Sequence, residues 1–289
     1  MTARPDVTGF FDEPTNTVSY VVGDPATKVC AIVDSVLDYD SASGRTATES
    51  ADQLIAHVKD KGFTVAWVLE THVHADHLSA APHIQEKLGG KLAIGENIRI
   101  VQDTFGKIFN AGTSFQRDGS QFDRLFKDGD AFMLGSMPGS VMHTPGHTPA
   151  CLTYVIGDAA FIGDTLFMPD FGTARADFPG GDARQLYRSI RRVLALPPET
   201  RLFLCHDYKA PGRDHFAWET TVAAERAGNV HVHDGVSEDE FVGMRNARDK
   251  TLGAPKLIIP SIQVNMNAGH FPAPDAEGNV YLKTPVNRF

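Results

Sequence analysis

Short apolar runs and helical patterns alternate along the chain. Val18–Val22 and Val29–Val33 are rich in β-branched residues and are separated by the turn-forming Gly23-Asp24-Pro25, which predicts two strands. From Glu49 to Lys59 the apolar residues recur at the spacing of one helix face. Phe63–Leu69 is a compact apolar run, which predicts a strand buried on both faces. The first third of the chain is therefore predicted to fold as strand, strand, helix, strand.

The same alternation continues to about Lys250, with turn signals between the elements. Gly89-Gly90 ends a predicted helix, Gly157-Asp158 predicts a β-hairpin, and Ser237-Glu238-Asp239-Glu240 has the pattern of a capping box. Asn110–Arg124 is polar and glycine-containing, and predicts a long loop. Helices are predicted at Ser79–Leu88, Ile98–Phe109, Arg184–Leu194 and from Ser237 to about Lys250, and strands at Lys91–Ile94, Cys151–Ile156, Ala159–Ile162 and Arg201–Cys205.

This order of elements predicts an α/β (or α+β) fold in which helices cover mixed sheets. The chain contains no low-complexity linker and no repeat, so residues 1–289 are predicted to form one domain. The tail from about Ala268 is rich in Pro, Gly and Asn, and we expect it to be an extension that runs over the surface.

Composition excludes several classes of protein. With 42% hydrophobic and 22% charged residues, the chain has an ordinary globular composition, and its net charge of −9 argues against binding nucleic acid or an anionic membrane. No apolar run approaches the roughly 18 residues of a membrane span, and the first residues lack the pattern of a secretory signal. We expect a soluble, cytoplasmic protein whose three cysteines, Cys30, Cys151 and Cys205, are reduced.

Four potential metal ligands follow the apolar run that ends at Leu69. They are His72, His74, Asp76 and His77, and in an extended chain His72 and His74 point to the same side. Imidazole and carboxylate together suit zinc, iron or manganese. Without a metal, such groups buried side by side would be desolvated with no common partner.

Three more candidates, His147, Asp164 and His206, each come directly after an apolar run. Each can therefore lie at the rim of a sheet, and Asp34 at the end of another run is placed to steady the ligands by hydrogen bonds. One polar residue at a strand end is an ordinary loop residue. Histidine or aspartate at four such strand ends predicts that these side chains meet in one cleft and hold a metal.

These motifs resemble those of the metallo-β-lactamase superfamily, in the same order along the chain. The resemblance spans about Asn16 to Asp207 and implies an αββα sandwich, two mixed sheets flanked by helices, with the metal at one edge. The matching motifs are Thr71-His72-x-His74-x-Asp76-His77, Thr144-Pro145-Gly146-His147-Thr148, Gly163-Asp164 and His206.

Two branches of that superfamily act on glutathione-linked substrates: the binuclear thioester hydrolase glyoxalase II, and the persulfide dioxygenases, also called sulfur dioxygenases. The chain looks more like the second, and it lacks the basic helical C-terminal region usual in glyoxalase II. The stretches that look like persulfide dioxygenases are Thr71–Leu78, Arg175-Ala176-Asp177-Phe178, His206-Asp207-Tyr208, Glu225-Arg226, and Ala254-Pro255-Lys256 to Asn265-Met266.

The resemblance to persulfide dioxygenases implies that His72, His147 and Asp164 hold one Fe(II) per chain. The implied reaction oxidises glutathione persulfide, or a related small persulfide, with O₂ to sulfite and free thiol. It also implies that His74, Asp76, His77 and His206 orient ligands and water, and that Arg175, Tyr208 and Arg226 bind the substrate. A homo-oligomer, most simply a dimer, is expected.

The sequence leaves two other functions open. In a binuclear zinc hydrolase of thioesters or lactones, His74, Asp76, His77 and His206 would hold a second metal, with Asp164 as the bridge. In a degenerate, non-enzymatic member of the superfamily, the site would serve for binding and not for catalysis. Two departures fall where the family is expected to bind the thiol: Gly172–Phe178 replaces the usual Gly-Arg-Thr-Asp-Phe, and Asn229-Val230-His231 replaces Asn-Pro-Arg.

Overall fold

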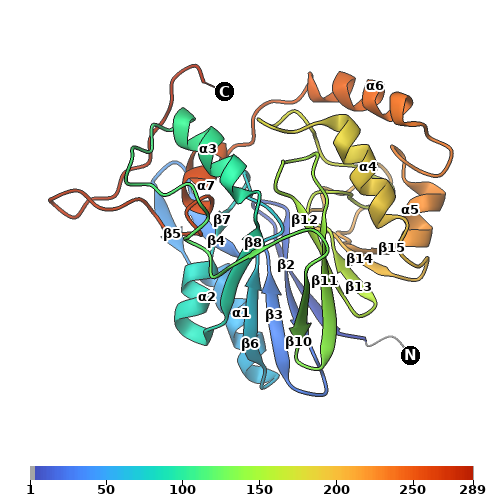
Figure 1. Ribbon diagram of the computed structural model, residues 1–289, viewed down its shortest axis with the longest axis horizontal. Helices are drawn as coiled ribbons and strands as arrows, with labels where there is room; N and C mark the ends of the chain where they lie inside the picture. Colours follow the sequence, from blue (N-terminus) through green and yellow to red (C-terminus); the bar gives the residue numbers. More distant parts are fainter. Residues whose placement is uncertain (1–3, 289) are drawn as a thin grey trace.

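Two six-stranded sheets pack face to face in the centre of the molecule (Figure 1). The structure is a computed structural model and describes residues 4–288. In spatial order, the first sheet contains β1 (Asp6–Asp12), β2 (Thr17–Gly23), β3 (Val29–Val33), β6 (Thr64–Leu69), β8 (Lys91–Gly95) and β9 (Arg124–Phe126). The second contains β10 (Ala131–Leu134), β11 (Met137–His143), β12 (Leu152–Ile156), β13 (Ala159–Phe161), β14 (Arg201–Phe203) and β15 (Glu219–Thr221).

Both sheets mix parallel and antiparallel pairs, as predicted. In the first sheet β2 pairs antiparallel with β3, whereas β3, β6, β8 and β9 are parallel to one another. In the second sheet only β13 and β14 are parallel. A small third sheet joins β5 (Arg45–Ala47), β4 (Val36–Asp40) and β7 (Leu78–Ser79).

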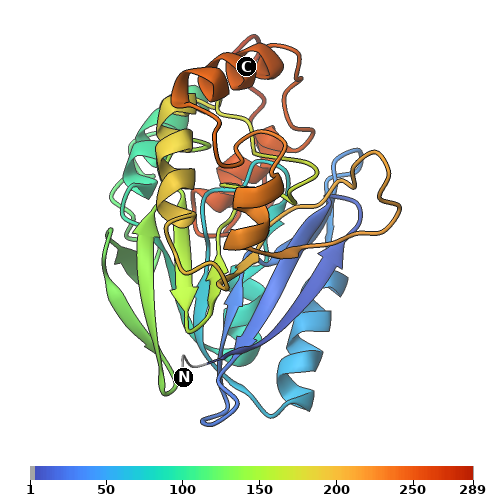
Figure 2. The ribbon, with the colours of Figure 1, turned by 90° about the vertical axis from the view of Figure 1, so that its right-hand side faces the viewer.

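Alternating side chains of the strands divide the apolar interior into layers. On β2, Val18, Tyr20 and Val22 face the second sheet, whereas Val21 faces the helices that cover the first sheet. These helices are α1 (Glu49–Asp60), α2 (Ala81–Leu88), α3 (Ile98–Ile108) and α7 (Ile258–Asn265). The outer face of the second sheet is covered by α4 (Ala183–Val193), α5 (Val222–Gly228) and α6 (Glu238–Asp249), and Figure 2 looks onto this side, with α4 in yellow.

The predicted αββα sandwich is therefore confirmed, with local corrections. The helix predicted from Ser79 begins at Ala81, because Ser79 belongs to β7 and pairs with Val36. The run Phe63–Leu69 is not buried throughout, since Thr64 is exposed and Trp67 is half-buried. The hairpin at Gly157-Asp158 is confirmed, as is the capping box of Ser237 with Glu240.

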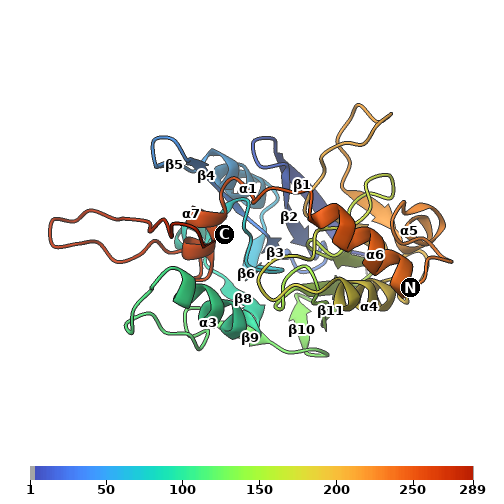
Figure 3. The same ribbon diagram turned by 90° about the horizontal axis from the view of Figure 1, so that it is seen from above.

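Two long segments without helix or strand lie against each other. They are the loop 109–123 and the tail 266–288, and the tail projects from the body of the molecule beside α3 in Figure 3. The amide of Gln263 exchanges two hydrogen bonds with the backbone of Lys283, and the Lys283 ammonium donates to the carbonyl oxygen of Asn110. A small cavity of about 310 Å³ lies between the two segments and α7.

Candidate metal centre

Strand ends bring the predicted ligands together at one edge of the sandwich. His72 follows β6, His147 lies in the turn between β11 and β12, Asp164 follows β13, and His206 follows β14. Because β13 and β14 are parallel, their carboxyl ends leave the sheet at the same edge. All four residues are buried.

His72, His147 and Asp164 form one group whose ligand atoms all lie within 4.8 Å of one another. Oδ2 of Asp164 is 3.7 Å from Nε2 of His72 and 3.5 Å from Nε2 of His147. Two atoms that each bind one ion at about 2.1 Å with tetrahedral angles are about 3.4 Å apart. The spacing of the three side chains therefore fits a single cation.

Hydrogen bonds behind the two imidazoles orient them. Nδ1 of His147 donates to the carbonyl oxygen of Arg175, 2.8 Å away. The Thr71 hydroxyl donates to Asp34 and lies 3.0 Å from Nδ1 of His72, so that Nδ1 donates to Thr71. In both rings the other nitrogen, Nε2, is left with its lone pair toward Asp164, which is the form that binds metals.

Several buried polar atoms at this edge have no hydrogen-bond partner among residues 4–288. They include Nε2 of His72, Nε2 of His77 and Oδ1 of Asp164. Buried polar atoms rarely lack a partner, and unpaired ones cost roughly 1–3 kcal/mol each. Burial, together with the neighbouring His74 and His147, also holds the pKa of His72 well below its usual value, so this imidazole is neutral. The donor set therefore fits a metal ion.

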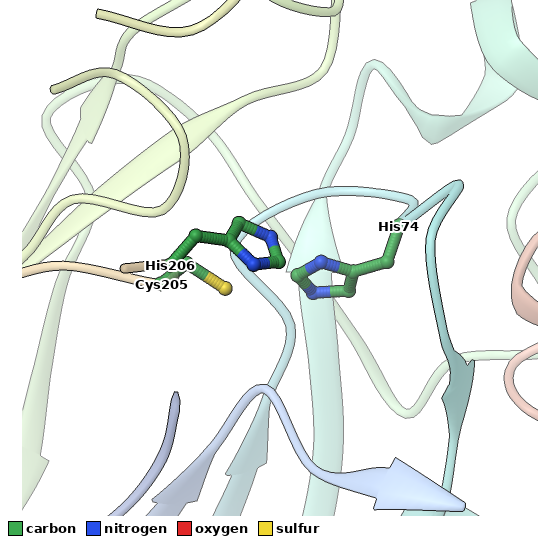
Figure 4. Close-up of side chains that lie close together, drawn as sticks. All are labelled: His74, Cys205 and His206. Atoms are coloured by element: carbon green, nitrogen blue, oxygen red, sulfur yellow. The ribbon is translucent and has the colours of Figure 1, made fainter. Parts of the chain in front are cut away.

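His74 is turned toward different partners. Its Nε2 lies 3.0 Å from Asp34 and 3.4 Å from Glu70. Burial disfavours the charged imidazole, but Asp34 overcomes this and the pKa of His74 is raised well above its usual value. Figure 4 shows the ring of His74 directed toward His206, with the sulfur of Cys205 beside them, and these three residues form a further group of closely spaced ligand atoms.

A second set of predicted residues lies on the other side of Asp164. Nε2 of His206 is 3.4 Å from Oδ1 of Asp164 and 3.3 Å from Oδ2 of Asp76. His77 is also 3.3 Å from Asp76, and the hydroxyl of Thr17 lies within hydrogen-bond distance of Asp76, His77 and His206. The two oxygens of Asp164 thus face two different groups of ligands.

A cavity of about 580 Å³ opens above these residues. His147, Asp164, Asp76 and His206 are at its wall, and so are two of the predicted substrate-binding residues, Arg175 and Tyr208. Among residues 4–288, neither the loop 109–123 nor the tail 266–288 contributes to its lining. Residues at the cavity wall that the sequence analysis did not name include Tyr39, Phe167, Arg245 and Arg248.

The three predicted substrate-binding residues differ in their surroundings. The guanidinium of Arg175 is held by both oxygens of Asp177, and the exposed ring of Tyr208 lies 5.7 Å from that of His206. Arg226 is on α5, over the outer face of the second sheet, where it pairs with Asp234. It does not line the cavity, so the structure separates it from the other two.

Comparison with known protein families agrees with the fold. The family model of the metallo-beta-lactamase superfamily matches residues 12–206. The chain therefore belongs to the metallo-beta-lactamase superfamily, whose members act as metal-dependent enzymes on small molecules. In addition, no helix within residues 4–288 is both long and apolar enough to cross a membrane.

Individual relatives carry different names. The chain is 59% identical over 97% of its length to a probable metallo-hydrolase of Burkholderia pseudomallei, covering 99% of that protein. It is 49% identical to Glyoxylase B2 of Dictyostelium discoideum, with 92% of each chain covered. It is 29% identical to the human mitochondrial persulfide dioxygenase ETHE1, covering 90% of this chain and 87% of the human one. Three beta-lactamase hydrolase-like proteins are longer, and the chain spans 65% of their length.

One solved structure combines sequence and structural similarity. The crystal structure of ETHE1 from Myxococcus xanthus superposes with a TM-score of 0.73 at 31% identity, covering 92% of this chain and all of that one. The similarity thus extends over both sheets and their helices, well beyond the ligand motifs.

Proposed function

We propose that this protein is a persulfide dioxygenase. It oxidises a low-molecular-weight persulfide, such as glutathione persulfide, with O₂ and water to sulfite and the free thiol. The observation that carries the proposal is the grouping of His72, His147 and Asp164 around one ion-sized position while His74 is bonded to Asp34. Two imidazoles and one carboxylate with open positions are the ligand set of non-haem iron oxygenases.

In this proposal His72, His147 and Asp164 hold a single Fe(II). Iron in such a ligand set supplies open coordination positions for a thiolate and for dioxygen. The bonds from His147 to Arg175 and from His72 to Thr71 keep both Nε2 atoms directed at the metal.

The remaining residues of the site bind substrate and water. Asp76, His77 and His206 lie within hydrogen-bond range of one another or of Thr17, and orient the water that enters the product. Tyr208 and Arg175 contact the thiol carrier in the cavity, and the cations of Arg248 and Lys256 at its wall suit the carboxylates of such a carrier. Arg226 is left out because it lies outside the cavity.

Two relatives named as persulfide dioxygenase or ETHE1 support the proposed activity. The chain resembles the human persulfide dioxygenase over nearly its whole length. The similarity to the Myxococcus ETHE1 structure covers that entire chain.

A binuclear zinc hydrolase of thioesters or lactones is the second candidate. It is favoured by the geometry of Asp164, whose two oxygens face His72 and His147 on one side and His206 on the other. A carboxylate that bridges two metals is placed in this way. The names of two closer relatives, the probable metallo-hydrolase and Glyoxylase B2, point in the same direction.

Metal content and oxygen uptake distinguish the two candidates. Protein produced without added zinc is analysed for metals, then assayed for glutathione-persulfide-dependent oxygen consumption and for thioester hydrolysis. One iron per chain with oxygen uptake supports the dioxygenase. Two zinc ions per chain with hydrolysis and no oxygen uptake would overturn it. The homodimer and the cytoplasmic location stay predictions, and light scattering of the purified protein tests the first.

A further inference from the structure

Asn265, the last residue of α7, is hydrogen-bonded to the turn that carries the ligands. Its Nδ2 donates to the carbonyl oxygens of His74 and His77, at 2.9 and 2.8 Å. Its Oδ1 accepts from the backbone amide of Ser79 at 2.8 Å. One buried side chain thus makes three bonds to a segment almost 190 residues earlier in the chain.

The turn between β6 and β7 needs such a partner. Residues 70–77 form neither helix nor strand, so their buried backbone groups are not paired by a regular ladder. Asn265 provides in one amide the two donors and the acceptor that this backbone requires. A change in its position would move His74 and His77 directly, and His72 through the chain.

The end of α7 is itself firmly held. Ile258, Ile262 and Met266 pack in the core beneath the first sheet. The amide of Gln102 on α3 donates to the carbonyl oxygen of Met266 at 2.9 Å. Asn265 is therefore supported by packing on one side and contacts the ligand turn on the other.

We propose that Asn265 is a positioning residue of the metal centre. It fixes the turn His72–Ser79 before the metal binds, so that His72 already faces Asp164 in the metal-free protein. Asn265 lies well beyond the residues 12–206 that match the superfamily, which makes the C-terminal segment a functional part of the metal site. The inference depends on the metal site of the proposed function but not on the reaction catalysed.

Asn265→Asp tests this, because it keeps the shape and the acceptor for Ser79 but places a carboxylate oxygen against two carbonyl oxygens. Gln263→Glu is the matched control: it makes the same amide-to-carboxylate change on α7 at similar burial, where the amide contacts Lys283 of the tail. Asn265→Ser, which replaces the amide by a shorter hydroxyl and so removes both Nδ2 donors without adding charge, serves if Asn265→Asp does not fold.

Two measurements are made on each folded variant: the dissociation constant for Fe(II) or Co(II) by competition with a chelator, and hydrogen exchange of the amides of residues 72–79 without metal. The Asn265 variants are expected to bind metal about 10–100-fold more weakly and to exchange these amides faster. For Gln263→Glu, the dissociation constant for the metal is expected to stay within about threefold of the wild-type value.

Folded Asn265 variants with wild-type metal affinity and exchange would overturn the inference, and so would an equal loss in Gln263→Glu. A wild-type protein that binds no metal would instead refute the proposed function, so the two failures are distinguishable.

Discussion

His147 and Arg175 are joined by a hydrogen bond from the imidazole Nδ1 to the backbone carbonyl oxygen, and this bond decides which nitrogen of His147 faces Asp164. The loop that carries Arg175 is fixed from α6. Asp249 accepts from the backbone amide of Ala176 at 2.8 Å, and Arg245, paired with Asp249, donates to the carbonyl oxygen of Thr173. A buried ion pair far from the ligands in sequence therefore sets the orientation of one of them.

Asp249→Ala is expected to destabilise the protein and weaken metal binding. The substitution leaves the guanidinium of Arg245 buried without the Asp249 carboxylate, which is expected to lower the free energy of unfolding by about 3–5 kcal/mol. It also frees the amide of Ala176, so the Arg175 carbonyl loses its fixed position behind His147. Denaturant unfolding measures the first effect, and chelator competition on the folded fraction measures the second.

Asp239→Ala is the control on the same helix, since Asp239 is highly exposed and pairs with Arg184 at the surface. Asp239→Ala is expected to lower the free energy of unfolding by less than about 1 kcal/mol and to leave the metal affinity unchanged. Equal effects of the two substitutions would contradict a link between Asp249 and His147.

His147→Ala and His206→Ala should differ in metal content if the site holds a single iron. His147 contributes one of three ligands, so its loss should leave essentially no bound metal after dialysis. His206→Ala should still bind one iron per chain, with affinity reduced by about tenfold at most, because it would act only through Asp76 and Asp164. Metal analysis of both variants tests this, and a fall from two metals to one in His206→Ala would favour the binuclear hydrolase.

The fold and the ligands could be predicted because their signals are local. Each ligand directly follows an apolar run, and the period of the apolar residues identified most of the long elements. The sequence does not predict α7, because this helix contains Pro260 and proline usually argues against a helix. The structure places Pro260 third in the helix, within the first turn, where a missing backbone N–H costs little.

Residues whose roles depend on distant contacts could not be predicted. Thr17 touches His206, and Asn265 touches the backbone of His77. Asn265 lies in a stretch that resembles persulfide dioxygenases, but neither its contact with the ligand turn nor that of Thr17 could be predicted, because each joins residues far apart in the sequence. Conversely, Arg226 was selected by resemblance alone. The short helix α5 packs through Val222 on the outer face of the second sheet, and Arg226 pairs with Asp234 there.

Tyr208→Phe and Arg226→Ala should separate residues in the cavity from residues outside it. Tyr208 lines the cavity next to His206, so loss of its hydroxyl is expected to raise KM for the persulfide by about fivefold, the value of one hydrogen bond. Arg226→Ala is expected to leave KM and kcat unchanged. Steady-state oxygen uptake measures both variants. A large rise of KM in Arg226→Ala would contradict the placement of Arg226 outside the substrate cavity.

Glu225→Gln should change how the stability of the protein depends on pH. Glu225 is completely buried on α5, one oxygen accepts from Asn229, and the other has no partner among the described residues. Burial raises the pKa of this carboxyl to about 8. The folded protein therefore binds a proton that the unfolded chain releases near pH 4.3.

A carboxyl whose pKa is raised by folding stabilises the protein fully below its unfolded pKa, and this stabilisation is lost as pH rises toward the folded pKa. Between about pH 4.3 and 8 the unfolding free energy of the wild type should thus fall, relative to Glu225→Gln, by up to about 1.4 kcal/mol per pH unit. Urea unfolding at pH 5.5, 7 and 8.5 measures the difference. The exposed Glu199→Gln serves as the control and should show no trend. A difference between Glu225→Gln and the wild type that is constant across this range would mean that Glu225 is already ionised in the folded protein.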